Sequence, residues 1–258
     1  MLPSVLSPLI SIIVPVFNEA ESLPLLCKEI VGVMGTRSFE VIVVDDGSTD
    51  ATARVITELC TSDTRILGFR MNKNTGKGGA LSVGMQHARG DPLITIDGDL
   101  QNDPKDIPLL LAALAGGADV ALGWRQERAD TSGKRWASAL FNTLCSFTFG
   151  KKLHDANTGF KALRRRAAGS LPISGSLFRF LPHLLAKKGW SVVEVPVHHH
   201  PRKFGQTKFS LSHRLRGLPD LLLALTVARS GIETVLPPYQ RLSPKVSPLP
   251  ERSGMIRA

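Results

Sequence analysis

The chain has 258 residues, of which 43% are hydrophobic, so it can bury one large core or two small ones, and a wholly disordered chain is excluded. Its 3 cysteines form no C-x-x-C pair, which argues against a disulfide framework or a zinc ribbon. The net charge is +10, but residues 1–120 hold 9 basic and 15 acidic side chains, whereas residues 121–258 hold 23 and 7. The acidic half suits a divalent cation, and the basic half suits phosphates, nucleic acid or an anionic membrane surface.

Short apolar runs alternate with helical patterns through the first half of the chain. Runs rich in β-branched residues predict buried strands, and apolar residues three or four positions apart predict helices between them. In chain order, we expect strands over 9–16, 39–44, 65–69, 92–96 and 118–122, and helices over 20–34, from Ser48 to about 59, over 76–88 and over 104–114. This alternation predicts an open, mostly parallel α/β sheet with helices on both faces, whose ligands bind at the carboxyl ends of the strands.

The second half is less regular. We expect helices over about 132–149 and 176–188, a turn at 155–160, a strand over 191–195 and a helical region over about 208–229. The stretch 208–225 joins a basic start to regularly spaced leucines, a pattern typical of a core helix or of a helix on a membrane surface. Five prolines and little periodicity predict a disordered tail over 237–258. No uncharged stretch free of prolines reaches the roughly 20 residues of a spanning helix, so we expect no integral membrane segment.

Acidic residues follow two of the predicted strands. Asp45 and Asp46 end strand 39–44, and Asp97 and Asp99 come directly after strand 92–96, with Gln101 close behind. The carboxyl ends of parallel strands meet at one edge of a sheet, so these oxygen-bearing side chains can together hold Mg²⁺ or Mn²⁺. The alternative for an Asp-x-Asp motif on its own is a turn or a helix cap.

A glycine-rich segment, Asn74 to Ala80, precedes the helix expected over 76–88. Its backbone N–H groups and Lys77 can cradle a phosphate, although a tight turn is the alternative. The segment does not fit the P-loop pattern, and no G-x-G-x-x-G follows the first strand. A P-loop ATPase and an ordinary nicotinamide site are therefore disfavoured.

Five motifs in sequence order carry a family resemblance: VPVFNE at 14–19, VDDGSTD at 44–50, GKG at 76–78, DGDLQNDP at 97–104 and GWR at 123–125. Together they resemble glycosyltransferase family 2, and most closely its dolichol-phosphate (polyprenyl-phosphate) mannosyltransferase branch, over about residues 10–215. The resemblance implies a GT-A type fold, a nucleotide-sugar donor and a divalent metal. With the tail set aside, we expect one domain over 1–236, with a nucleotide-sugar half (1–120) and an acceptor half (121–236).

The resemblance implies a role for each matching residue. Donor binding falls to Pro15, Glu19, Asp46, Lys77, Asp97, Arg202 and Lys208; metal binding to Asp97, Asp99 and Gln101; the acceptor phosphate to Arg125 and Arg135; and catalysis to Asp99, Arg125 and Arg135. The sequence departs from relatives in having Gly98 where the branch commonly has alanine, and in lacking both a late Q-x-x-R-W motif and the two terminal transmembrane helices of many bacterial relatives. We therefore expect peripheral attachment at the cytoplasmic face of a membrane, directly on an anionic surface or through a separate anchoring protein.

The acceptor decides what catalysis needs. A hydroxyl requires a general base, whereas a lipid monophosphate is already anionic and requires cations that offset the repulsion between phosphates. The basic second half favours the phosphate. Asp155 keeps a hydroxyl acceptor open, because it can act as the base; its alternative role is that of a turn residue or of a partner for a nearby arginine. His198, His199 and His200 are interpreted as a loop rather than a metal site.

We predict a metal-dependent, inverting transferase that moves a hexose, mannose from GDP-mannose, onto a polyprenyl or dolichyl phosphate. The alternatives are another nucleotide sugar of the UDP-glucose type or a glycan hydroxyl acceptor. The sequence contains no recognised nucleic-acid motif, so we expect no nucleic-acid partner.

Overall fold

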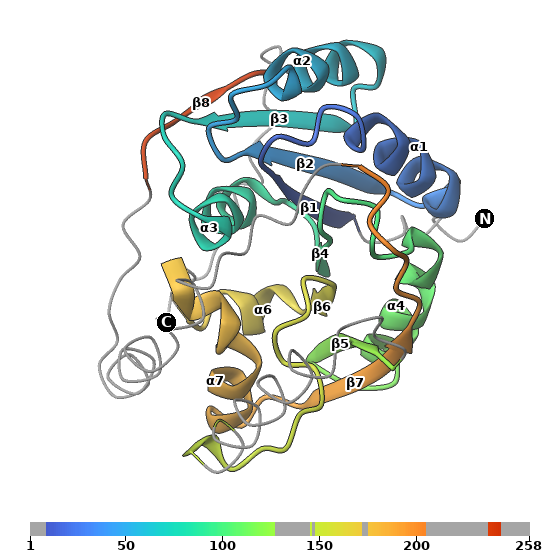
Figure 1. The fold of residues 1–258 in the computed structure, drawn as a ribbon. Coiled ribbons are helices and arrows are strands. Elements are labelled where there is room, and N and C mark those ends of the chain that lie inside the picture. The colour runs from blue at the N-terminus through green and yellow to red at the C-terminus, as the bar shows by residue number, and fades with distance from the viewer. Residues whose placement is uncertain (1–8, 127–144, 146–147, 172–174, 205–236, 244–258) are drawn as a thin grey trace, which may run out of the picture.

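The computed structural model describes residues 9–126, 145, 148–171, 175–204 and 237–243, and its secondary-structure elements form one mixed sheet with helices on both faces (Figure 1). The strands are β1 (Ile10–Val16), β2 (Phe39–Asp45), β3 (Ile66–Met71), β4 (Leu93–Thr95), β5 (Val120–Arg125), β6 (Lys161–Leu163), β7 (Val192–Val197) and β8 (Tyr239–Arg241). The α-helices are α1 (Leu23–Met34), α2 (Thr52–Ser62), α3 (Lys77–His87), α4 (Ile107–Ala115), α6 (Arg165–Ala168) and α7 (Leu181–Lys187); the 3₁₀ helices are η1 (Pro104–Asp106) and η2 (Gly175–Arg179).

The sheet has the strand order β7-β5-β6-β4-β1-β2-β3-β8. Strands β4, β1, β2 and β3 are parallel to one another, and β5 is parallel to β7. Strand β6 runs antiparallel to both β4 and β5, and so joins the two parallel groups. The carboxyl ends of β1, β2 and β4 therefore lie at one edge of the sheet, as the sequence predicted.

Two hydrophobic cores explain why the central strands are continuously apolar. Successive side chains of a strand point to opposite faces, so Ile12 packs into the core under α1, α2 and α4, whereas Ile13 packs into the core under α3 and α7. Every residue of β2 is buried for the same reason.

The predicted first-half elements are confirmed, with shifts of a few residues at their ends. The helix expected over 104–114 starts as η1, where the Asp103 side chain accepts a hydrogen bond from the Lys105 N–H, before α4 begins. The helix expected over 176–188 is divided into η2 and α7. The three-residue strand β6 and the short helix α6 were not predicted.

Strand β8 corrects the expectation of a tail that is disordered from residue 237. Tyr239 to Arg241 pair antiparallel with Met71 to Phe69 of β3, and Tyr239 packs edge-on against Phe69. The sheet thus extends past the boundary predicted at residue 236. The helix expected over 132–149 falls largely outside the described residues, and the stretch 208–229 and residues 244–258 lie wholly outside them. No helix in the described ranges combines the length and apolarity needed to cross a bilayer.

Candidate active site

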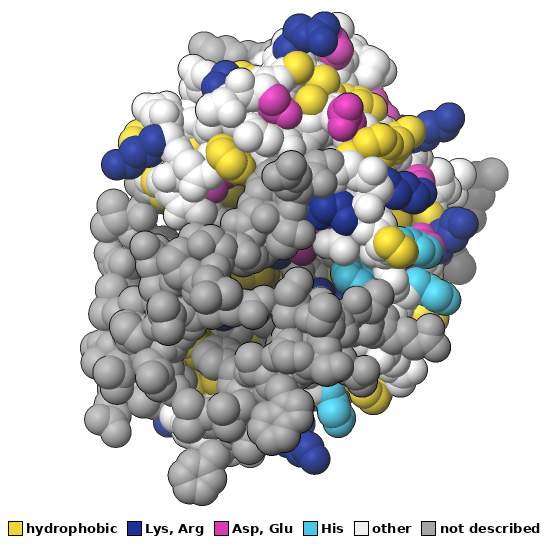
Figure 2. All heavy atoms as spheres, in the orientation of Figure 1, with side chains coloured by type: hydrophobic (Ala, Val, Ile, Leu, Met, Phe, Trp, Pro, Cys, Tyr) yellow, Lys and Arg dark blue, Asp and Glu magenta, His cyan; other side chains and the backbone are white. Residues whose placement is uncertain are grey.

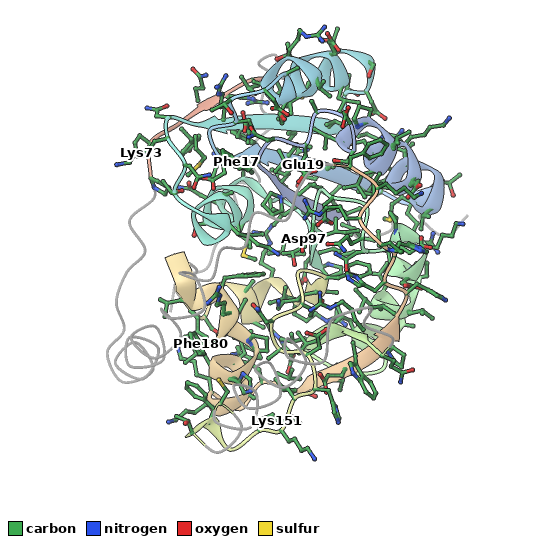
Figure 3. The ribbon with its side chains drawn as sticks, viewed as in Figure 1. Phe17, Glu19, Lys73, Asp97, Lys151 and Phe180 are labelled. Carbon is green, nitrogen blue, oxygen red and sulfur yellow. The ribbon has the colours of Figure 1, made fainter. Side chains whose placement is uncertain are left out.

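Three carboxylates gather at the carboxyl edge of the sheet. Glu19 follows β1, while Asp97 and Asp99 follow β4. Figure 3 shows Asp97 near the middle of the molecule, with Glu19 on the side of β1 and α1. Glu19 and Asp99 are buried, and the Asp97 side chain keeps 31% of its surface exposed. Acidic groups are thus concentrated at the carboxyl ends of the strands, where the sequence predicted that ligands bind.

Two basic side chains meet these carboxylates. Lys77, the first residue of α3, donates from Nζ to Oδ1 of Asp97. Arg202, which follows β7 in the chain, donates from Nη2 to Oδ2 of Asp99 at 2.6 Å, and its Nη1 lies 3.7 Å from Oε1 of Glu19. The structure therefore brings together predicted donor residues from both halves of the chain.

The two neighbouring aspartates differ in their electrostatic surroundings. Burial raises the pKa of Asp99, and the nearby negative charge of Asp97 raises it further against the effect of Arg202. For Asp97, desolvation also acts to raise the pKa, but the Lys77 ammonium, assisted by Lys161 and Arg125, outweighs it and lowers the pKa. The pKa values of these two carboxyl groups are therefore shifted in opposite directions.

The donor set of this edge fits a hard divalent cation. Mg²⁺ is commonly held by one or two carboxylates, with substrate phosphates and water completing its shell, and Asp97 and Asp99 supply such a pair. Among the described residues, no group of three or more His, Cys, Asp and Glu forms a metal site by itself. The Gln101 side chain donates to the His200 carbonyl at 3.4 Å, so its role as a third ligand stays a prediction.

Asp46 organises the turn that delivers Lys77. Its Oδ1 accepts the Thr75 N–H at 2.8 Å, and its Oδ2 accepts the Gly76 N–H at 2.9 Å. Burial raises the pKa of Asp46 against these hydrogen bonds. Gly76 has a φ of +84°, a backbone conformation that glycine adopts freely, and α3 begins at the next residue. A nucleoside contact for Asp46, as for Pro15 on β1, stays a prediction.

Arg125, which the sequence predicted to bind the acceptor phosphate, lies at the end of β5. Arg125 donates from Nε to Oδ2 of Asp155 at 2.6 Å and from Nη2 to Oδ1 at 2.9 Å. The Asp155 backbone N–H donates to Glu194 at 2.8 Å, and Glu194 also accepts from the backbone and ring of His154. Of the two interpretations of Asp155, its pairing with a nearby arginine is confirmed. Arg135 and Lys208 lie outside the described residues, so their roles stay predictions.

Comparison with known proteins decides the family. Residues 11–171 match the family described as Glycosyl transferase family 2. The chain belongs to glycosyl transferase family 2. This family 2 chain is 34% identical over 220 residues to the undecaprenyl-phosphate 4-deoxy-4-formamido-L-arabinose transferase of Klebsiella pneumoniae, covering 84% of the chain and 67% of that protein. The enzyme of the same name from an Enterobacter species is 34% identical over 224 residues, with the same coverage.

Solved structures support the GT-A fold of this family 2 member. The glucosyl-3-phosphoglycerate synthase of Mycobacterium tuberculosis, in complex with Mn²⁺ and UDP-glucose, matches with a TM-score of 0.66 at 20% identity, over 91% of this chain and 86% of that one. The same enzyme with Mg²⁺ and UDP matches with a TM-score of 0.67 at 20% identity, over 85% and 80%. The predicted fold class is confirmed.

Two histidines after β7 hold the loop that leads to Arg202 in this family 2 chain. The ring of His198 lies 2.9 Å from Oδ1 of Asp106, and that of His200 lies 3.1 Å from Oδ2 of Asp103. In Figure 2, histidine side chains (cyan) lie close together on the face of the molecule that is shown. These pairs tie the segment before Arg202 to the last residue of η1 and to the residue that precedes η1, in agreement with the interpretation of this segment as a loop.

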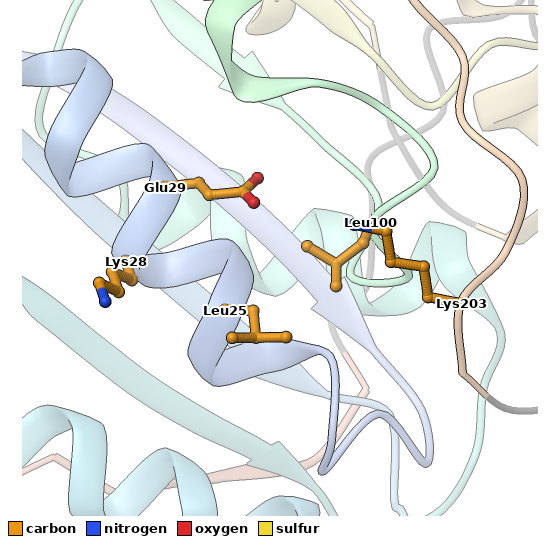
Figure 4. Close-up of a pocket in the computed structure, with 5 residues that line it drawn as sticks. All are labelled: Leu25, Lys28, Glu29, Leu100 and Lys203. Atoms are coloured by element: carbon orange, nitrogen blue, oxygen red, sulfur yellow. The ribbon is translucent and has the colours of Figure 1, made fainter.

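Beside the Asp99 loop, a shallow hollow of about 460 Å³ lies between α1 and residues 100 and 203 (Figure 4). It is lined by Leu25, Lys28, Glu29, Leu100 and Lys203. Leu100 has a φ of +60°, a left-handed conformation, in the turn where the Gln101 N–H donates to Oδ1 of Asp99 at 3.2 Å.

Sequence reasoning missed one charged residue of the site. Lys161 is fully buried, its Nζ donates to the Thr158 carbonyl, and it lies 4.3 Å from the centre of the Phe178 ring. Burial, followed by the charge of Lys77, lowers the pKa of Lys161 well below its usual range, while Asp97 and Asp155 act to raise it. The only signal in the sequence was a lysine within an apolar run, GFKAL, in a chain where most lysines are exposed.

Proposed function

We propose that this family 2 glycosyltransferase moves a glycosyl group from a nucleotide sugar to the phosphate of a polyprenyl phosphate, with inversion at the anomeric carbon. An oxygen of the acceptor phosphate attacks the anomeric carbon and forms the new C–O bond. The bond from that carbon to the donor diphosphate breaks, and the nucleoside diphosphate leaves with the electron pair. The two curated relatives, whose names specify undecaprenyl phosphate, support the acceptor.

One observation carries the choice of acceptor. Asp155, the acid considered as a base for a hydroxyl, has both carboxylate oxygens bonded to Arg125. A carboxylate held by a guanidinium is a weak proton acceptor, because the pair would have to lose its charge-assisted hydrogen bonds on protonation. A phosphate acceptor needs no such base, and it can bind to arginine.

Different basic residues of the chain would bind the acceptor phosphate and the donor diphosphate. Arg125, held in orientation by Asp155, would bind the acceptor phosphate, whereas Lys77 and Arg202, which lie beside Asp97 and Asp99, would bind the donor diphosphate. Mg²⁺ or Mn²⁺ held by Asp97 and Asp99 would neutralise charge on the leaving diphosphate. The cationic side chains would bring two anionic substrates together against their mutual repulsion.

The donor is proposed by class, as a nucleotide sugar. Mannose from GDP-mannose finds no support in the comparisons, because the two relatives are named for 4-deoxy-4-formamido-L-arabinose. The fold neighbours were solved with UDP or UDP-glucose, but at 20% identity they speak for the fold alone.

We place the reaction at the cytoplasmic face of a membrane, with the chain attached peripherally. A long polyprenyl tail stays in the bilayer, so the enzyme has to reach the phosphate at the surface. The 23 basic and 7 acidic residues of 121–258 favour an anionic surface. A separate anchoring protein is the alternative.

The test pairs two acceptors that differ only at the head group. The enzyme is incubated with Mn²⁺, a short polyprenyl phosphate or the matching polyprenol, and one of three labelled donors: GDP-mannose, UDP-glucose or a nucleotide-activated 4-deoxy-4-formamido-L-arabinose. We expect label in the lipid extract with the phosphate and none with the alcohol. Transfer to the polyprenol at an equal rate would overturn the proposal, and the preferred donor identifies the sugar.

A further inference from the structure

The turn that precedes β6 is fixed from several sides. Thr95 of β4 donates from its hydroxyl to the Gly159 carbonyl at 2.8 Å. Within the turn, the Thr158 N–H donates to the Asp155 carbonyl at 3.2 Å, and the Phe160 N–H donates to the Thr158 hydroxyl at 3.2 Å. The backbone of residues 155–160 is therefore held against the end of β4.

Gly159 lies directly against the Asp97 carboxylate. A Cβ atom at position 159 would lie 2.1 Å from Oδ2 of Asp97 and 2.4 Å from its Cγ, closer than non-bonded atoms approach. The φ of Gly159 is not in the left-handed region, so backbone conformation is not what requires glycine here. The space that a side chain would fill is the space that Asp97 occupies.

The other end of the same turn holds the acceptor-side arginine. Asp155 receives two hydrogen bonds from Arg125, and its own N–H is fixed by Glu194. On the far side of the turn, buried Lys161 bonds to the Thr158 carbonyl and lies over Phe178, the ring that Lys77 approaches to 5.4 Å. Residues 155–161 thus reach from the Arg125 side of the site to the Asp97 side.

We propose that Gly159 is a positioning residue for the donor side: it sets the place of the Asp97 carboxylate, and through residues 155–159 it ties that place to Arg125. This inference rests on the proposed function for the roles of Asp97 and Arg125. The predicted effect of a side chain at position 159 is to displace Asp97 from Lys77 and from the cation, and so to weaken metal-dependent nucleotide binding. Displacement of a site group by about 1 Å can cost a hundredfold in function.

The test compares Gly159→Ala with Gly32→Ala. Gly32 lies in α1 with nothing within 4 Å of its added Cβ, so it receives the same methyl group without a collision. Binding of Mn²⁺ in the presence of UDP or GDP is followed by loss of the paramagnetic resonance signal of free Mn²⁺, and folding by thermal unfolding. We expect about a tenfold or greater loss of affinity in Gly159→Ala and less than a twofold change in Gly32→Ala.

A double variant shows whether the effect runs through Asp97. If it does, Gly159→Ala combined with Asp97→Asn binds no more weakly than Asp97→Asn alone. Should Gly159→Ala fail to fold, Thr95→Val provides a second test, because it removes the hydrogen bond to the turn without adding volume. We expect the loss of Mn²⁺ affinity in Thr95→Val to come within about threefold of the loss in Asp97→Asn. Unchanged affinity in Gly159→Ala, or additive losses in the double variant, would overturn the positioning role. No acceptor is present, so failure of the proposed acceptor leaves this result intact.

Discussion

Replacing Asp155 by asparagine tests the acceptor side most directly. The Asp155 and Arg125 side chains are 4% and 17% exposed, so Asp155→Asn leaves a nearly buried guanidinium without a counter-charge. Removing one partner of a buried ion pair costs about 3–5 kcal/mol, and we expect a value near the lower limit because asparagine keeps one acceptor oxygen. A matched control is Asp119→Asn, because its charged partner Arg166 is 71% exposed and the amide oxygen of asparagine can still accept the Ser191 N–H. This variant should cost no more than about 1 kcal/mol.

Two measurements test this prediction, one of stability and one of enzyme kinetics. Urea unfolding of both variants gives the two free-energy changes. Steady-state kinetics with polyprenyl phosphate should show a raised KM for the acceptor in Asp155→Asn, because Arg125 is no longer held in place. Turnover should fall less than about tenfold, since a general base contributes about a hundredfold or more.

Two results would refute this reasoning. If Asp155→Asn lost turnover by roughly a thousandfold with normal unfolding, Asp155 would be a base rather than a partner of Arg125. If Asp155→Asn were no less stable than Asp119→Asn, the ion pair would not be the buried contact on which the argument depends.

Three further predictions follow from the carboxylates, a buried histidine and the charge of the second half. Asp99→Asn keeps the volume of the side chain, so the variant should fold, but it should lose at least about a hundredfold in transfer. The wild type in excess EDTA should show the same loss, and full activity in either case contradicts the metal site. Burial lowers the pKa of His183 to about 4, so the unfolded state takes up a proton first, and stability should fall by about 3 kcal/mol as pH drops from 6.5 to 4. His183→Leu should remove that component of the acid sensitivity in urea unfolding at a series of pH values, and an unchanged pH profile contradicts it. The chain should sediment with anionic but not neutral vesicles, less so in high salt or in Arg214→Glu with Arg216→Glu; equal indifference to both vesicle types contradicts surface binding.

The sequence predicted the donor half well because its strands are buried on both faces. Continuous apolar runs such as β2, closed by Asp45 and Asp46, leave little doubt about where a strand ends, and parallel pairing then places those ends together. The positions of Asp97 and Asp99 at the same edge as Asp45 and Asp46 follow from that rule alone.

The acceptor half was harder because its contacts join residues far apart in the chain. Strand β6 has 3 residues and begins with Lys161, which local patterns assign to the surface. The pairings of Arg125 with Asp155 and of Arg202 with Asp99 span 30 and 103 positions, and no local pattern specifies them. Strand β8 was missed because it pairs with β3 through only 3 residues after a proline pair.

The placement of β6 between β4 and β5 has a consequence for synthesis. During translation, β4 can pair with β1 as soon as residues 93–95 leave the ribosome, but its other side waits for residues 161–163. Until then the growing chain carries an unpaired strand edge flanked by the apolar side chains of Leu93 and Ile94, which other chains can pair with. Strand β6, which follows the turn that lies against Asp97, is therefore also the strand that covers the unpaired side of β4 and protects the nascent sheet from aggregation.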